Sequence, residues 1–476
     1  MENINFKKLL FTLIFSFTIW FLPVPVGLKP EAIYLLAVFL GIILGIILKA
    51  APMGTLSMLA IAVVTLTGML APDDPEKAIS LALSGFSNTI IWFITVSVFI
   101  ARGFIKSGLG TRIAYFFIKK FGRTPLGLAY SLSFADFILA PAIPGNTARA
   151  GGIIYPIMQS IADSMGSTPD SEESRHRIGT FLTLCCYNAT LITSAIFLTG
   201  TSSNLMCQKF AADLGISISW GYWALAGIFP GIISLFVTPV IIKKIVPPQI
   251  KSTHQAVTAA AEYLKKLGPL QPEEKWMVIT FLVLLFLWIA GPLWKINATT
   301  SAFVGLALLL LTQVLTWEDV KKEQAAWDSF IWFSALVMMA SGLNTLGFFN
   351  WLGELIKLYL ANLSWLIAFP VIVLVYFYSH YLFASATAHV AAMYAVLLGL
   401  GVSLGVPGTL LALMLGFTGS LYGTLTQYGH GPAPVLFGSG YVTVTEWWKT
   451  GFLLSVSFLL IWLVLGGVWW KVIGVF

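Results

Sequence analysis

Long apolar segments separated by short polar ones dominate the chain. A helix needs about 20 mostly apolar residues to cross the hydrocarbon core of a bilayer. Segments of this kind begin at Ala32, Met53, Thr89, Ile178, Trp220, Trp276, Thr299, Phe330, Leu366 and Gly451. Shorter or interrupted apolar stretches occupy 126–143, 149–162, 386–404, 408–422 and 433–443. We therefore predict an all-α polytopic membrane protein with about eleven transmembrane helices and two re-entrant hairpins that enter the membrane without crossing it.

The first 31 residues have the pattern of a retained transmembrane helix. Lys7 and Lys8 precede an apolar run from Leu9 to Val26, which lacks a small-residue cleavage site and is followed at once by another apolar run. This pattern favours a first transmembrane helix over a signal peptide. Many aromatic residues lie near segment ends, as interfacial belts require; they include Trp20, Trp220, Trp294, Trp447, Trp448, Trp469 and Trp470.

Two polar loops bear on topology. The stretch 163–177 is polar throughout, and the stretch 243–275 carries six lysines. By the positive-inside rule the lysine-rich stretch lies in the cytoplasm, together with the basic run at 119–123. Residues 255–267 have helical spacing, so we predict a cytoplasmic basic linker helix within 243–273. A surface-lying linker is favoured there over a regulatory element.

An internal repeat relates the two sides of this linker. Residues 92–110 resemble 332–347, and their Trp-Phe pairs stand 240 positions apart. The same offset places the segment at 145–148 on that at 385–388. We predict repeat 1 over 32–242, with a hairpin tip near 145–147, and repeat 2 over 274–476, with a tip near 385–387. An odd number of spans per copy would give inverted topology, with the substrate site at the repeat interface.

Downstream, Thr201 and Thr426 would pair only after fifteen residues are removed from the first copy. The polar loop 163–177 supplies about that many residues. Chance recurrence of small residues in apolar sequence is the alternative explanation, but the register is kept across two separate motifs.

Composition and charge fit this picture. Hydrophobic residues make up 58% of the chain and charged residues only 10%, whereas soluble domains carry about 25% charged residues. The net charge of +7 comes from lysines at segment ends and in loops, so we predict no nucleic-acid partner. The three cysteines lack metal or disulfide spacing, and we expect them to pack in the core; they are Cys185, Cys186 and Cys207.

The segment 141–152 is the first candidate for chemistry. Two prolines, three glycines and the pair Asn146-Thr147 interrupt an apolar stretch. Proline frees backbone groups, and such backbone survives at membrane depth only where it lines a cavity. A helix that restarts there aims N–H groups and its positive end into the cavity, which suits a carboxylate. A simple proline-kinked helix is the alternative.

Three other breaks have the same character. Ser385, Ala386 and Thr387 repeat the plan of the first tip without proline, and polar glycine-containing interruptions occupy 199–204 and 423–432. Discontinuous helices of transporters have interruptions of this kind.

Ionisable residues inside these segments are few. Because a charge within the membrane is costly, each such residue is a candidate for a functional role. Arg149 and His389 each stand two positions after a tip threonine, so they should flank the site. Asp136 could be the partner of a buried cation or a proton carrier, and the role of His380 is open.

Together these motifs resemble the divalent anion/sodium symporter family. That family carries a Ser-Asn-Thr signature in each repeat, which here reads Gly145-Asn146-Thr147 and Ser385-Ala386-Thr387. The surroundings PAIPGNTARAGGIIYP, FASATAHVAAMYA and LTQYGHGPAPVLFGSGYV are similar to the branch of 2-oxoglutarate/malate translocators and citrate/succinate-type exchangers. The resemblance implies a homodimer in the inner membrane, in which a mobile transport part carries di- or tricarboxylate in an elevator-like movement.

The resemblance also implies that substrate carboxylates sit between the two tips and that the later loops complete the pocket. The candidate substrate-binding residues are then Gly145, Asn146, Thr147, Ser385, Ala386, Thr387, Thr201, Ser202, Asn204, Thr424, Thr426 and Tyr428.

Departures from the signature bear on coupling. Gly145 and Ala386 each remove a side-chain oxygen from the family pattern, so no cofactor is predicted and bound sodium is doubted. We hypothesise that Arg149 and His389 compensate the substrate charge instead. An empty carrier with unpaired buried cations would cross the membrane poorly, which would make exchange obligatory. A sodium-coupled symporter is the alternative function.

Two other classes are disfavoured. Ser385 and His389 are four apart, as a nucleophile and base could be, but no acid at a matching position orients the histidine. The chain also lacks a nucleophile elbow, an HExxH motif and a phosphate loop. A channel would need a continuous polar stripe, whereas the polar residues here sit at helix breaks. We therefore predict a transporter and not an enzyme.

Overall fold

A computed structural model describes the chain except for residues 1–3, 349–350, 352–354, 356–363 and 384. None of the described residues lies in a β-strand. Within this part of the chain, ten helices are long and apolar enough to cross a membrane. The predicted all-α polytopic class is therefore confirmed. Ala384, in the second tip motif, lies outside the described residues.

The ten long helical segments are Pro30–Leu48 (α2), Thr89–Ser107 (α5), Gly179–Ile196 (α11), Trp220–Ile245 (α13), Pro272–Trp294 (α15 and η4), Gln324–Thr345 (α18), Trp365–Leu382 (α20 and η5), Ala386–Ser403 (α21, η6 and α22), Gly408–Leu425 (α23 and η7) and Val444–Val472 (α25, η8 and α26). The shorter helices are Phe6–Trp20 (α1), Met53–Thr67 (α3), Pro75–Ala82 (α4), Leu109–Phe121 (α6), Pro125–Leu139 (α7), Asn146–Arg149 (α8), Tyr155–Ser164 (α9), Glu172–Arg177 (α10), Ser202–Asp213 (α12), His254–Leu267 (α14), Ala298–Leu311 (α16), Trp317–Lys322 (α17) and Ala433–Gly438 (α24).

Local capping explains where the helices begin. The predicted starts at Thr89 and Trp220 are confirmed, because the Asn88 and Ser219 side chains accept hydrogen bonds from the backbone N–H groups of the first helical turn. The start expected at Gly451 was seven residues late. The side chains of Thr443 and Glu446 form a capping box that begins α25 at Val444, ahead of the continuous apolar run.

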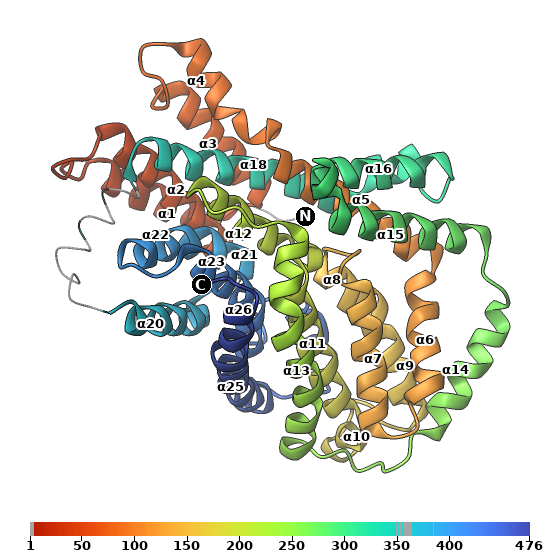
Figure 1. The fold of residues 1–476 in the computed structure, drawn as a ribbon. Helices are drawn as coiled ribbons and strands as arrows, with labels where there is room; N and C mark the ends of the chain where they lie inside the picture. The colour runs from red at the N-terminus through yellow and green to blue at the C-terminus, as the bar shows by residue number, and fades with distance from the viewer. Residues whose placement is uncertain (1–3, 349–350, 352–354, 356–363, 384) are drawn as a thin grey trace.

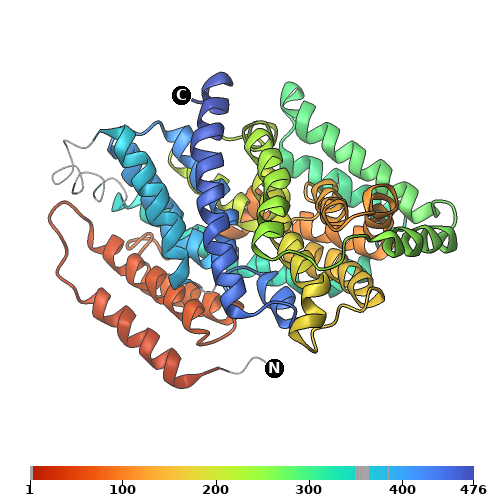
Figure 2. The same cartoon turned by 90° about the horizontal axis from the view of Figure 1, so that it is seen from below.

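The helices form two groups (Figures 1 and 2). We call α1–α5 with α15–α18 the panel, and α6–α13 with α20–α26 the site unit. Figure 1 shows α3, α18 and α16 in a row below α4, with most of the site unit beneath them. In the panel, α3 packs on α18 and α16 packs on α5, so each short helix contacts the long helix of the other predicted repeat. Figure 2 places α1 at an outer edge, where it packs on α2.

The site unit has its core around α11. This helix is entirely buried and packs against α7, α13 and α23. The cysteines expected in the core, Cys185, Cys186 and Cys207, are buried free thiols. In contrast, Pro272–Trp294 and Trp365–Leu382 are mostly exposed, which for apolar helices means exposure to lipid.

Secondary structure repeats at the offset expected from sequence. α8 is followed by one π-helical turn, η2 (Ala150–Ile154), and α21 by another, η6 (Val390–Tyr394), so the same combination recurs 240 positions later. Further along, the 3₁₀ turns η3 (Leu198–Gly200) and η7 (Tyr422–Leu425) end at Thr201 and Thr426. Both threonines are in the extended conformation, which supports the pairing that sequence suggested.

Two segments lie outside this correspondence. α10 belongs to the polar loop 163–177, and its Arg175 and His176 contact Glu446 at the start of α25, with N···O distances of 2.6 and 2.7 Å. α14 occupies the lysine-rich linker and packs on α6, where Tyr115 and Tyr263 stack with ring centroids 4.1 Å apart.

Candidate functional site

The first tip follows the end of α7. Pro141 and Pro144 lie between α7 and the restart of the helix at Asn146, where Gly145 occupies the N-cap without a side-chain hydrogen bond. The first N–H groups of a helix have no partner within it. Asn146 is buried and Thr147 is exposed. The tip therefore offers uncapped backbone N–H donors, a buried side-chain amide and an exposed hydroxyl.

The second tip is capped differently. Ser385 is the N-cap of α21, and its hydroxyl accepts a hydrogen bond from the Ala388 N–H at 3.4 Å. The hydroxyl of Tyr422 donates to the Ala386 carbonyl at 3.0 Å, which joins this tip to the break at the end of α23. Thr387 is partly exposed. The π turn after each tip widens the helix, a feature that recurs at functional sites.

The break at 198–204 is held against the first tip. Thr199 donates its hydroxyl to the Pro141 carbonyl at 2.6 Å and accepts a hydrogen bond from the Trp220 indole at 3.0 Å. The Arg149 guanidinium also donates to the Gly200 carbonyl at 3.1 Å. The structure therefore brings the first tip and this break together.

The break at 423–432 lies between the two tips. A Cβ added to Gly431 would lie 2.2 Å from Oγ1 of Thr147 in the first tip. A Cβ added to Gly429 would lie 2.4 Å from Nε2 of His380, next to the second tip. Glycine is therefore required at both positions for this backbone to approach so closely. All four helix breaks predicted from sequence converge here.

Arg149 does not have the role expected from sequence. Its guanidinium is fully buried and forms an ion pair with Asp136, with Nε 2.8 Å from Oδ1. Its other N–H groups donate to carbonyls of Ile143, Gly200 and Thr190 and to hydroxyls of Thr193 and Ser194. Of the two roles that sequence offered for Asp136, the ion pair agrees with that of a partner for a buried cation. The idea that Arg149 is an unpaired cation in the empty carrier is corrected, because Asp136 meets its charge and the protein uses all its donors.

His389 lies among polar neighbours, and no carboxylate of the described residues pairs with it. Its Nε2 is 3.1 Å from the Ser379 hydroxyl, and its Nδ1 is 3.1 Å from Nδ1 of His380. The Tyr422 ring stacks on His380 with centroids 3.8 Å apart. Because Ser385 caps its own helix and His389 bonds to Ser379, the two do not form the nucleophile and base that an enzyme would need.

Several predicted binding residues use their side chains inside the protein. Asn204 donates to the carbonyls of Ser194 and Phe197, and Thr424 donates to the Asn188 amide oxygen at 2.7 Å. Thr426 accepts from the Gly429 N–H, Tyr428 donates to the Tyr381 carbonyl, and Thr201 lies 3.4 Å from the Ser203 hydroxyl. These contacts hold the breaks in shape. Ser202 is partly exposed on the first turn of α12.

Sequence reasoning missed one buried residue at the centre of the site. His430 belongs to the break at 423–432, and its Nδ1 lies 3.3 Å from the Asn146 amide nitrogen. The flanking glycines Gly429 and Gly431 could have pointed to it, because a polar residue between glycines in a membrane segment indicates backbone close to a neighbour.

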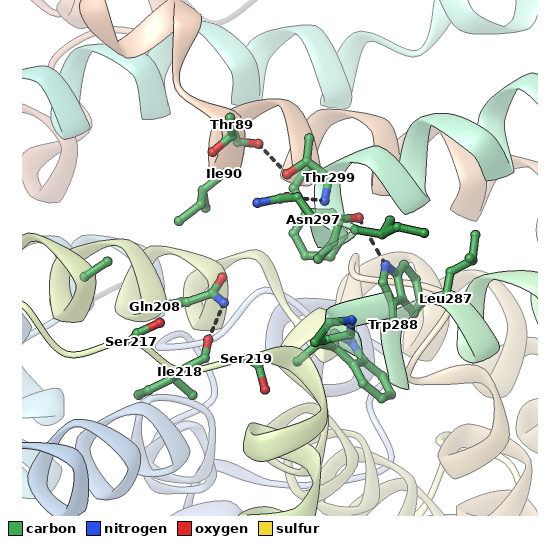
Figure 3. Close-up of a pocket in the computed structure, with 16 residues that line it drawn as sticks. Thr89, Ile90, Gln208, Ser217, Ile218, Ser219, Leu287, Trp288, Asn297 and Thr299 are labelled. Atoms are coloured by element: carbon green, nitrogen blue, oxygen red, sulfur yellow. Dashed lines mark hydrogen bonds between the residues drawn. The ribbon is translucent and has the colours of Figure 1, made fainter. Parts of the chain in front are cut away.

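A separate cavity lies on the boundary between the panel and the site unit (Figure 3). It has a volume of about 300 Å³, with Thr89, Asn297 and Thr299 on the panel side and Gln208 and Ser219 on the site-unit side. None of the predicted binding residues lines it. It therefore marks a loosely packed part of the boundary between the two units.

A bundle of long apolar helices in which two interrupted helices begin at uncapped or lightly capped tips is typical of a secondary transporter. Comparison with known proteins identifies the family. The family model described as "Sodium:sulfate symporter transmembrane region" matches residues 3–476. The chain belongs to this family and is a membrane transporter, not an enzyme.

Similar relatives span nearly the whole chain. The "Putative malate transporter YflS" of Bacillus subtilis is 50% identical over 473 residues, covering 99% of this chain and 97% of that protein. The "Dicarboxylate transporter 1, chloroplastic" of Spinacia oleracea is 42% identical over 476 residues, covering 99% and 82%. The "Inner membrane protein YbhI" of Escherichia coli is 38% identical over 476 residues, covering 99% of each.

A solved structure shares the fold. The YdaH transporter of Alcanivorax borkumensis, described as having an unusual topology, superposes with a TM-score of 0.56 at 13% identity. The match covers 84% of this chain and 89% of that one. At this identity the likeness shows the fold alone.

Proposed function

We propose that this protein exchanges small dicarboxylates, such as 2-oxoglutarate, malate or succinate, across the inner membrane without bound sodium. The observation that carries the proposal is the convergence of four helix breaks, two of which are tips that restart a helix. Each tip offers backbone N–H groups and the positive end of a helix, which together favour an anion. Relatives whose names specify malate and dicarboxylate transport support the choice of substrate.

The anion would bind between the tips. Backbone donors after Gly145 and Ser385 would hold its two ends, and the hydroxyls of Thr147, Ser385 and Thr387 would add to them. The hydroxyls of Thr147 and Thr387 make no hydrogen bond within the described residues, which leaves them available. Asn204 and Thr424 would act through the shape of their loops, since their side chains are already bonded.

Obligatory exchange would follow from unmet donors. Because Asp136 neutralises Arg149, the empty site has no unpaired cation there. The cost of moving the empty carrier would come instead from buried N–H groups without acceptors. An unsatisfied buried donor costs about 1–3 kcal/mol. A carrier without substrate would bear several such costs when its tips move away from water, whereas a loaded carrier would not. His389 would add to charge compensation only when protonated.

The two groups of helices suggest how movement could occur. The panel would stay fixed, and the site unit would carry substrate past it as an elevator does. The cavity between Thr299 and Gln208 leaves this boundary incompletely packed, which would lower the cost of sliding. We further propose that the panel forms a homodimer, with the repeats inverted and α14 in the cytoplasm.

Uptake into proteoliposomes tests this function. Labelled 2-oxoglutarate would be offered to vesicles with or without internal malate, each with and without sodium. The proposal expects uptake that needs internal malate and is unaffected by sodium. Uptake into empty vesicles that requires sodium would overturn it.

A sodium-coupled symporter is the second candidate, favoured by the family description, which names sodium and sulfate. Sodium binding would require oxygen ligands in addition to those that the tips retain, because Gly145 and Ala386 lack the side-chain oxygens of the family signature. Labelled sulfate, tested in the same vesicles, separates the two anion classes: sodium-driven sulfate uptake that succinate does not inhibit would favour this candidate.

A further inference from the structure

His430 is a buried polar side chain at the centre of the site. The residue is 3% exposed, yet its Nε2 has no hydrogen-bond partner in the described part of the chain. A Cβ at Gly423 would lie 2.7 Å from its ring, so the backbone packs directly on the imidazole. The ring is therefore held in place by its surroundings, and only Nε2 is left without a partner.

Asn146 fixes which nitrogen of His430 carries hydrogen. The Asn146 amide nitrogen lies 3.3 Å from Nδ1, and an amide NH₂ group can only donate. With the amide in this orientation Nδ1 accepts, which places the hydrogen of the neutral ring on Nε2. His430 thus presents a buried N–H donor with no acceptor.

His380 provides a useful contrast. Among the described residues its Nε2 also lacks a hydrogen-bond partner, but its Nδ1 faces Nδ1 of His389 at 3.1 Å. One hydrogen between those two nitrogens can belong to either ring, so Nε2 of His380 can be a donor or an acceptor. Of these two histidines, His430 is the one whose neighbour imposes a donor role.

The position of this donor defines its ligand. Asn146 and Thr147 belong to the first tip, and Gly431, the neighbour of His430, lies against Thr147 Oγ1. The His430 ring is therefore next to the first tip, whose helix begins without a side-chain cap. A group that accepts from several N–H donors at once is a carboxylate.

We propose that His430 donates its Nε2–H to a carboxylate of the bound anion and that Asn146 holds the imidazole in the tautomer this requires. The inference rests on the proposed function, since it names a binding residue for that substrate. It makes His430 a determinant of selectivity for anions with two carboxylates over those with one.

Two amide substitutions separate the roles of the ring nitrogens. Glutamine places its NH₂ near the position of Nε2, whereas asparagine reaches only as far as Nδ1. In exchange assays with labelled succinate, His430→Gln should keep KM within about threefold of wild type. His430→Asn should raise KM about 10- to 100-fold, the range for loss of a charge-assisted hydrogen bond. His254→Asn, on the exposed first turn of α14, is the matched control and should change nothing.

A substrate change tests the carboxylate contact directly. Wild type should prefer succinate over its monomethyl ester, measured by competition. This preference should shrink about tenfold in His430→Asn and be retained in His430→Gln. A structural defect would weaken both ligands equally and leave the ratio unchanged, so an unchanged ratio overturns the inference.

Ligand-induced thermal stabilisation in detergent provides a measurement that needs no transport. Succinate should raise the unfolding temperature of wild type and His430→Gln, but that of His430→Asn much less at the same concentration. Equal shifts in all three overturn the inference. If wild type neither binds nor transports any dicarboxylate, the proposed function itself fails; if it does and the two substitutions behave alike, only the role of His430 fails.

Discussion

Arg149 Nε lies 2.8 Å from Asp136 Oδ1 in an ion pair with essentially no exposure to solvent. The two residues stand on opposite sides of the first tip, one in α7 and the other in α8. The pair therefore fixes the arm that enters the tip to the helix that leaves it. The same guanidinium reaches the Gly200 carbonyl, so one side chain holds three segments of the site together.

Removing one member of this pair should destabilise the protein more than removing both. Asp136→Asn leaves an uncompensated buried guanidinium and should cost about 3–5 kcal/mol, while Asp136→Leu combined with Arg149→Met should cost less. Thermal unfolding in detergent measures both. If the losses in unfolding free energy from changing each residue simply added in the double variant, that result would contradict a compensated pair. Transport should fall at least tenfold in each variant, because the tip loses its attachment.

Tyr422→Phe should loosen the second tip. The change deletes the hydrogen bond to the Ala386 carbonyl and leaves the stack on His380, at a cost of about 1–2 kcal/mol. Because the affected carbonyl belongs to the tip, KM for the anion should also rise. Tyr394→Phe is the control: it removes a similar bond, to Ala412, and should reduce stability without changing KM. Equal KM values in both variants would remove Tyr422 from the site.

Gly451→Ala should damage transport through the break at 423–432. A Cβ at Gly451 would lie 2.1 Å from the Thr424 carbonyl oxygen, so α25 would have to move away from the break. Gly467→Ala, in the same long apolar segment, meets no atom within 4 Å and should be neutral or slightly stabilising. Exchange rates and unfolding temperatures of the two variants check this. Similar rates for both would show that the break tolerates movement of α25.

Glu446→Gln should release α10 from α25. The carboxylate accepts from Arg175 and contacts His176, so the substitution removes an ion pair at a partly exposed site. We expect a loss of about 1 kcal/mol, smaller at high salt because screening already weakens the wild-type pair. Unfolding temperatures at low and high ionic strength measure it. Glu318→Gln, on exposed α17, is the control and should have no measurable effect.

Much of the fold could be predicted because its determinants are local. The start at Trp220 follows from Ser219, and the correspondence of the tips follows from a constant spacing between similar motifs. The early start of α25 was missed because Glu446 interrupts the apolar pattern that served as the guide. Hydropathy alone does not reveal that a capping box can begin a helix before its apolar run.

The site was predicted less completely, because side-chain partners come from distant segments. Which breaks matter could be inferred from proline, glycine and polar residues within apolar stretches. The pairing of Arg149 with Asp136 depends on the path of the chain through the tip, and the approach of His430 to Asn146 spans 284 positions. Such contacts are set by tertiary packing. The helix breaks could therefore be predicted from sequence, but the hydrogen-bond donors that remain without an acceptor could not.

The polar loop 163–177 is joined to the start of α25 through Arg175 and Glu446. Both partners belong to the site unit, so their contact would stay the same wherever that unit stood relative to the panel. In the movement that we propose, the two halves of the site unit would therefore travel as one rigid body. An anion held between their tips would then keep its contacts throughout the step.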